Sequence, residues 1–305
     1  MLNQPKRLKK GDTVGIISTS SPVDREALRR SLTFVEELGL QAKMGKYAER
    51  DTGYLAGRDE ERLADLHDMF EDPEVDGIFC SGGGYGAARL IDRIDYGLIR
   101  ENPKVFWGYS DISILHAAIG KYAELVTFHG PMLASDAGTD KFSELSAKMF
   151  RQLFEPMELY YSEGIAPLET IAGGIGQGEL TGGNLTRLCS IIGTKFEPET
   201  TGKVLLIEDI SDDPQRADSQ LNQLRLARKL EDLAGVIIGD FKKADGPDNK
   251  GRLSDVFRHY FSSLGVPVVS GFRIGHCEPN FAVPLGSDAR LDGDTKTLTV
   301  LPGIE

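Results

Sequence analysis

The feature that most constrains the fold of this chain is the alternation of short apolar segments with helical patterns along residues 13–129. In one such pattern, residues 24–38, the apolar side chains Leu28, Leu32 and Val35 recur at the spacing of one helix face. Strands and helices that alternate at this spacing predict a parallel sheet with helices on both faces, a flavodoxin-like arrangement. We expect strands at residues 13–18, 41–44, 77–80, 104–107 and 126–129, and helices at residues 24–38, 59–70, 87–94 and 112–122.

The stretch 156–178 differs from its neighbours because it contains several glycines and two prolines and has little helical periodicity. We interpret it as a domain boundary, with an N-terminal domain of residues 1–155, a linker of residues 156–177 and a C-terminal domain of residues 178–305. The length of 305 residues also favours two domains over one. For the second half we expect a smaller α/β domain with extra strands at its end: helices at residues 185–192, 217–229 and 254–264, and strands at residues 204–207, 236–239, 266–270, 282–284 and 297–301.

The composition narrows the class of protein without naming a substrate. A hydrophobic fraction of 40% is sufficient for a globular core. The net charge of −12 argues against general binding to nucleic-acid phosphates or to an anionic membrane surface. No apolar stretch is long enough for a signal sequence or a membrane span. The three cysteines, Cys80, Cys189 and Cys277, have no zinc or redox spacing, so we expect a reduced cytoplasmic protein.

A serine in the turn Gly108-Tyr109-Ser110-Asp111 is the first candidate for chemistry. The turn follows an apolar strand and precedes a helical pattern, so Ser110 is predicted at the carboxyl edge of the sheet, beside a helix N-terminus. Nucleophile elbows have this geometry, although the usual final glycine is missing here. The alternative is a serine that simply caps the helix.

The glycine-rich run Ser81–Gly86 follows the preceding strand and is predicted at the same sheet edge. Its backbone N–H groups could form an oxyanion hole or bind a phosphate. A plain strand-to-helix turn explains the run equally well. A nucleotide-binding module is the rival from another class, but the run contains no Walker lysine.

The C-terminal half supplies an acid and a base. Glu208 ends an apolar strand, where it is either functional or a solvated strand terminus. His276 lies in a loop bounded by Pro279 and is a candidate base. His129, at the end of a predicted strand, is a rival base, and Cys277 is a rival nucleophile.

These residues together resemble the LD-carboxypeptidases, the serine-peptidase family of murein tetrapeptide carboxypeptidases and microcin-C self-immunity hydrolases. The resemblance covers nearly the whole chain. It implies Ser110 as nucleophile, His276 as base and Glu208 as orienting acid. The matching motifs, in order, are Lys10-Gly11-Asp12, Gly83-Gly84-Tyr85-Gly86, Gly108-Tyr109-Ser110-Asp111, Thr127-Phe128-His129-Gly130-Pro131-Met132, Gly182-Gly183-Asn184-Leu185, Glu208-Asp209, and Gly275-His276 followed by Pro284-Leu285-Gly286.

The resemblance further implies a cytoplasmic homodimer that needs no metal or organic cofactor. Its substrate would be a murein tetrapeptide that loses its terminal D-alanine during wall recycling. The backbone N–H of Asp111, with that of Gly83 or Gly84, would form the oxyanion hole. A carboxypeptidase also needs a cation for the free terminal carboxylate, because a guanidinium binds that group bidentately. The candidate substrate-binding residues are Tyr85, Arg89, Arg216 and Arg225.

One position departs from the murein branch of this family. Members of that branch often have an arginine before Gly-Gly-Tyr-Gly, where this chain has Gly82. The departure keeps a second substrate class open, in which the same Ser-His-Glu triad cleaves acyl-sulfamoyl adenylates of the microcin type.

Overall fold

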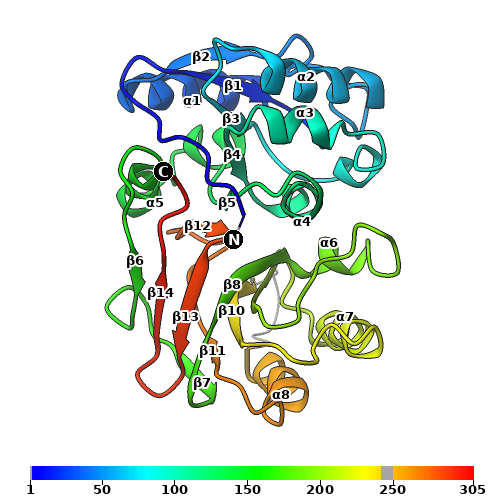
Figure 1. Cartoon of the computed structure of the whole chain (residues 1–305), viewed down its shortest axis with the longest axis vertical. Helices are drawn as coiled ribbons and strands as arrows, with labels where there is room; N and C mark the ends of the chain where they lie inside the picture. The colour runs from blue at the N-terminus through cyan, green and yellow to red at the C-terminus, as the bar shows by residue number, and fades with distance from the viewer. Residues whose placement is uncertain (1, 242–249) are drawn as a thin grey trace.

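The computed structural model describes residues 2–241 and 250–305, which form two sheets stacked end to end (Figure 1). The first sheet has the order β12-β5-β4-β3-β1-β2. Its five N-terminal strands are parallel, as the alternation of strands and helices predicted. They are β1 (Thr13–Ile17), β2 (Gln41–Met44), β3 (Gly77–Cys80), β4 (Val105–Gly108) and β5 (Thr127–His129).

Helices cover both faces of this sheet. Helix α1 (Arg25–Glu37) packs on one face through Leu28 and Val35, among the same apolar residues as Ile16 and Phe79. The opposite face is covered by α2 (Asp59–Glu71), α3 (Tyr96–Glu101) and α4 (Ser113–Tyr122). The flavodoxin-like expectation is therefore confirmed for residues 13–129. The helix predicted at residues 87–94 was wrong in extent, because only the single 3₁₀ turn Ala87–Arg89 forms there.

The second sheet has eight strands in the order β6-β14-β13-β8-β9-β10-β11-β7. Its centre is parallel, from β8 (Ile175–Asn184) through β9 (Val204–Asp209) and β10 (Gly235–Phe241) to β11 (Val268–Ser270). Antiparallel strands flank this centre: β13 (Asp288–Asp292), β14 (Thr297–Val300), β6 (Leu159–Tyr161) and β7 (Glu169–Ala172). Helices α6 (Leu185–Cys189), α7 (Pro214–Leu226) and α8 (Lys250–Phe261) belong to this half of the chain (Figure 1).

Two features of this arrangement differ from the sequence prediction. The stretch 156–177, interpreted as a linker, contains β6, β7 and the start of β8, so it is part of the second sheet. Its neighbouring glycines reflect close backbone packing as well as turns: a Cβ on Gly182 would lie 2.0 Å from the carbonyl oxygen of Leu206. Strand β12 (Val283–Leu285), expected in the second domain, pairs instead with β5 of the first sheet.

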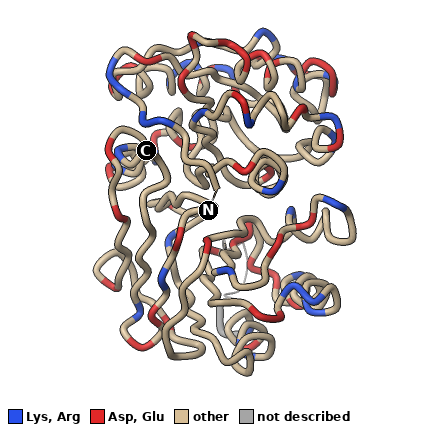
Figure 2. The backbone as a smooth tube through the Cα atoms, in the orientation of Figure 1, with Lys and Arg blue, Asp and Glu red and all other residues tan. Residues whose placement is uncertain are grey.

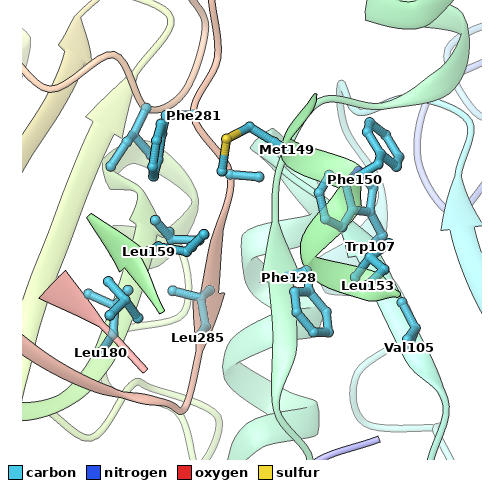
Figure 3. Close-up of a cluster of buried hydrophobic side chains, with 14 of the residues drawn as sticks. Val105, Trp107, Phe128, Met149, Phe150, Leu153, Leu159, Leu180, Phe281 and Leu285 are labelled. Carbon is cyan, nitrogen blue, oxygen red and sulfur yellow. The ribbon is translucent and has the colours of Figure 1, made fainter. Parts of the chain in front are cut away.

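One hydrophobic core connects the two sheets. Figure 3 places Leu285 of β12 between Phe128 of the first sheet and Leu159 and Leu180 of the second sheet, with Trp107 beyond Phe128. All five side chains are at most 6% exposed. The helix α5 (Glu144–Lys148) and the 3₁₀ turn Met149–Leu153 lead into this core. Because the apolar packing is continuous, residues from the two halves are held at fixed positions relative to each other.

The surface carries charges of both signs. In the view of Figure 2, lysine and arginine residues are interspersed with aspartate and glutamate residues over both halves of the molecule. Among residues 2–241 and 250–305, no helix has the length and apolar character needed to cross a bilayer.

Candidate active site

Ser110, His276 and Glu208 form one hydrogen-bonded series where the two halves of the chain meet. His276 Nε2 lies 3.0 Å from Ser110 Oγ, and His276 Nδ1 lies 2.7 Å from Glu208 Oε2. The serine follows β4, the glutamate lies within β9, and the histidine lies in the loop after β11. Serine hydrolases use this arrangement of hydroxyl, imidazole and carboxylate.

The backbone at Ser110 has the conformation of a strained turn. Its φ of 65° lies in the left-handed region, which non-glycine residues adopt rarely and often at functional sites. The 3₁₀ turn Ser110–Ile112 leads directly into α4. The capping alternative does not describe this serine, because the hydroxyl faces His276 and makes no side-chain cap.

The glycine run after β3 lies against the serine. A Cβ on Gly83 would lie 2.9 Å from Ser110 Cβ and 3.4 Å from the backbone nitrogen of Asp111, so only glycine allows this approach. The carbonyl of Gly83 accepts a hydrogen bond from the N–H of Ser21. The two segments predicted to supply oxyanion donors, 83–84 and 111, are thus adjacent to the hydroxyl.

The loop that carries His276 is anchored at several points. Gly275 donates its N–H to Asn280 Oδ1 at 2.9 Å, and the N–H of Asn280 is donated to Ser146 Oγ at 2.9 Å. Gly275 has φ 114°, and a Cβ there would lie 2.4 Å from Glu208 Oε2. A glycine before the histidine therefore lets the imidazole reach the carboxylate.

The electrostatics of the imidazole depend on its acid partner. Burial alone would lower the pKa of His276, but the charge and hydrogen bond of Glu208, with smaller contributions from Asp136 and Asp209, together outweigh burial, so the pKa is raised above its usual value. The Tyr109 ring lies 4.9 Å from the imidazole, centroid to centroid, and its hydroxyl donates to Asp136 Oδ1 at 3.1 Å. Asp136 is a neighbour of the site that sequence reasoning missed, since it lies in no pattern that indicates chemistry. Tyr109 lies in the serine turn, but its contact with the imidazole was not predicted.

The rival base and the rival nucleophile have other surroundings. His129 is fully buried, and its Nε2 lies 4.0 Å from Glu208 Oε1. Within residues 2–241 and 250–305, neither of its ring nitrogens has a hydrogen-bond partner. Burial, with smaller contributions from His116 and His276, holds the pKa of His129 well below its usual value. Cys277 donates its thiol to the carbonyl of Pro279, and burial raises the pKa of that thiol, which disfavours the reactive thiolate.

A cavity of about 560 Å³ opens beside Ser110 and His276. Of the predicted cations, only Arg216 is among its lining residues, where Nη2 donates to Thr186 Oγ1 at 2.8 Å. Arg89 forms a two-pronged ion pair with Asp59, with separations of 2.8 to 3.0 Å. Arg225 donates to Asn222 Oδ1, and neither Arg89 nor Arg225 is among the residues that line the cavity.

Tyr85, a predicted substrate-binding residue, contacts Arg187, which lines the cavity. Tyr85 is 46% exposed and is not a lining residue, but its ring lies 5.9 Å from the Arg187 guanidinium carbon. Arg187 lines the cavity and was missed by sequence reasoning, because a lone arginine within a predicted helix gives no signal.

The part of the chain that the structure describes contains no group of three or more His, Cys, Asp or Glu residues able to hold a metal ion.

Comparison with known proteins agrees with this architecture. Residues 14–130 match the model of the LD-carboxypeptidase N-terminal domain, and residues 177–291 match that of the C-terminal domain. A probable murein peptide carboxypeptidase of Bacillus subtilis is 48% identical, over 99% of this chain and 95% of the relative. The microcin C7 self-immunity protein MccF of Escherichia coli is 26% identical, over 95% of this chain and 93% of the relative.

A solved structure gives the same result in three dimensions. The crystal structure of an MccF-like protein from Bacillus anthracis superposes with a TM-score of 0.89 at 28% identity, covering 98% of this chain and 99% of that protein. The fold and the site thus define a two-domain serine-type hydrolase. The chain belongs to the LD-carboxypeptidase family, and it is a serine-type carboxypeptidase.

Proposed function

We propose that this enzyme hydrolyses the amide bond between an L-centre and a C-terminal D-amino acid, and that it releases D-alanine from murein tetrapeptides in peptidoglycan recycling. The observation that carries this proposal is the Ser110-His276-Glu208 series beside the 560 Å³ cavity. The 48% identical relative named as a probable murein peptide carboxypeptidase favours this substrate class. The resemblance in sequence further leads us to propose a cytoplasmic homodimer.

In the proposed mechanism, Ser110 Oγ attacks the carbonyl carbon of the scissile amide while His276 Nε2 accepts the hydroxyl proton. Glu208 accepts a hydrogen bond from Nδ1, which fixes the tautomer and stabilises the imidazolium. His276 then donates the proton to the departing amine. Water then attacks the acyl-enzyme while His276 accepts a proton from it, and His276 returns that proton to Ser110 Oγ as the acid product leaves.

The tetrahedral intermediate carries a negative oxygen that needs donors. We assign these donors to the backbone N–H of Asp111 and to one N–H from Gly83 or Gly84, because these segments border the Ser110 hydroxyl. Loss of one such donor typically lowers kcat by about 10²- to 10³-fold.

Arg216 is the residue we propose for the free terminal carboxylate of the substrate, because it is exposed on the cavity wall and its partner Thr186 is neutral. Arg216→Met will lower kcat/KM on the free-acid tetrapeptide by about ten- to a hundredfold, the effect of one lost charge-assisted hydrogen bond. On the C-terminally amidated peptide the same variant will lose little. Arg89→Met and Arg225→Met provide the comparison and will keep the preference for the free acid. A uniform loss on both peptides in Arg216→Met would contradict this assignment.

The alternative substrate is an acyl-sulfamoyl adenylate of the microcin type. The similarity to MccF favours it, because the same triad could serve either substrate. The identity to that protein is 26%, against 48% to the murein peptide carboxypeptidase, so the murein substrate remains the main proposal.

A side-by-side assay tests the choice between the substrates. Purified enzyme is given the murein tetrapeptide, its C-terminal amide and an acyl-sulfamoyl adenylate, and the released D-alanine, D-alaninamide and sulfamoyl adenosine are quantified. We expect the free-acid tetrapeptide to be cleaved about ten- to a hundredfold more efficiently than its amide. Equal cleavage of acid and amide, together with faster cleavage of the adenylate, would reject the carboxypeptidase proposal and favour the microcin-type amidase.

A further inference from the structure

Arg187, on α6 in the C-terminal half of the chain, makes contact with both segments that are assigned to the oxyanion hole. Its Nη2 donates to the carbonyl of Gly84 at 2.8 Å, and its Nε lies 3.2 Å from Asp111 Oδ1. The Arg187 side chain is 26% exposed, whereas that of Asp111 is fully buried. One guanidinium therefore connects the glycine run after β3 with the turn after β4.

The partner carboxylate itself organises the N-terminal half of the site. Asp111 Oδ2 accepts the hydroxyl of Ser20 at 2.8 Å and the N–H of Ala87 at 2.8 Å. These bonds connect the residue after Ser110 to the loop after β1 and to the end of the glycine run. A buried carboxylate needs a cation as well as hydrogen bonds, because an uncompensated charge is costly in the interior.

The glycine run is also held from the other side. Arg62, fully buried on α2, donates to the carbonyl of Gly86 at 3.0 Å. The two arginines differ in origin, because Arg62 belongs to the same half as the glycine run and Arg187 to the opposite half. Only the bond from Arg187 depends on how the two halves are packed.

We propose that Arg187 is a positioning residue that holds the two oxyanion-donor segments, at Gly84 and Asp111, in place from across the domain boundary. This inference rests on the proposed function, since it assumes that these segments stabilise the intermediate. It makes the oxyanion hole complete only when both halves of the chain are packed together. The planar guanidinium is suited to the task, because it presents donors in two directions from one rigid group, whereas a lysine ammonium is a single point charge.

The test compares three variants by kinetics on the tetrapeptide and by the rate at which a fluorophosphonate labels Ser110. Arg187→Met will lower kcat and the labelling rate by about ten- to a hundredfold, because a charge-assisted contact is lost. KM will stay within about twofold, because the loss falls on the transition state. Arg187→Lys keeps a charge near Asp111 but loses the bond to Gly84, so it will fold like the wild type and lose about tenfold in kcat. Arg93→Met, which removes an exposed arginine paired with Glu60, is the matched control and will behave as the wild type.

A pH profile separates positioning from a general loss of structure. Burial raises the pKa of Asp111, and the hydrogen bond from the Ala87 N–H, the charge of Arg187, the hydrogen bond from Ser20 and the charge of Arg62 counteract that rise. In Arg187→Met the pKa of Asp111 will rise further, so activity will show an additional loss on the acid side of the profile, while the limb set by the pKa of His276 stays in place. In Arg187→Lys this additional loss will be absent.

Three outcomes would overturn the inference. They are an unchanged kcat in Arg187→Met, a raised KM with unchanged kcat, and an Arg187→Lys variant with full activity. The second would assign Arg187 to substrate binding instead. Failure of the proposed function is distinguishable, because the wild-type enzyme would then release no D-alanine or would not be labelled at Ser110.

Discussion

Replacing Ser110 with alanine will lower kcat by about 10⁴- to 10⁶-fold and leave the fold unchanged, because the members of such a triad act as a unit. The serine hydroxyl contributes the nucleophile and a hydrogen bond to His276 Nε2. Its removal leaves the cavity, the glycine run and the His276–Glu208 pair in place. Released D-alanine measures the activity, and circular dichroism with thermal unfolding checks the fold.

Cys277→Ser is the matched control for this variant, because it changes a side chain of similar size next to His276. The thiol donates to a carbonyl and has its pKa raised by burial, so the substitution will change kcat by no more than about twofold. Full activity in Ser110→Ala would reject the serine mechanism. Loss of activity in Cys277→Ser alone would instead identify the cysteine as the nucleophile.

Replacing Glu208 with glutamine will lower kcat by about 10⁴-fold, because an amide no longer selects the imidazole tautomer that can accept the serine proton. The carboxylate is fully buried and lies 2.7 Å from His276 Nδ1. Glu179→Gln changes a glutamate of β8 that pairs with Lys203, and it will keep wild-type activity.

The Glu208→Gln variant will also shift the pH dependence of kcat/KM in a direction that can be predicted. His276 must be neutral to accept a proton, so kcat/KM rises as the pH increases through its pKa. Glu208 raises this pKa above the usual value for histidine. In Glu208→Gln that contribution is lost, and the acid limb of the profile will move to lower pH. An acid limb that stays in place would show that Glu208 does not control the imidazole.

Part of the site could be predicted from local sequence alone. The turn at Ser110 and the run at Gly83 each follow an apolar strand of a parallel sheet, and adjacent parallel strands end at one edge. Their proximity therefore follows from periodicity and chain order. The choice between His276 and His129 as the base does not follow from periodicity and chain order, because both histidines follow or end strands and both lie near Glu208. Only the packing of the two halves brings the His276 imidazole within hydrogen-bond distance of Ser110.

The glycine-rich stretch before β9 shows where local reasoning fails. Glycine and proline indicate turns, so local reasoning predicts a linker at residues 156–177. In the structure Gly176 lies in β8, where the carbonyl of Ala234 approaches too closely for any side chain. A strand neighbour of this kind belongs to a distant segment, and the spacing of residues three or four apart carries no information about it.

The sequence by itself determined the strand–helix order of the first sheet, the edge at which its polar turns meet, and the family to which the motifs belong. The tertiary structure decided the pairing of β12 with β5, the placement of Arg216 rather than Arg89 or Arg225 at the cavity, and the contacts of Arg187. The physical reason is separation along the chain. Local periodicity reports neighbours within one or two turns, whereas Ser110 and His276 are 166 residues apart and are brought together by a core that both halves share.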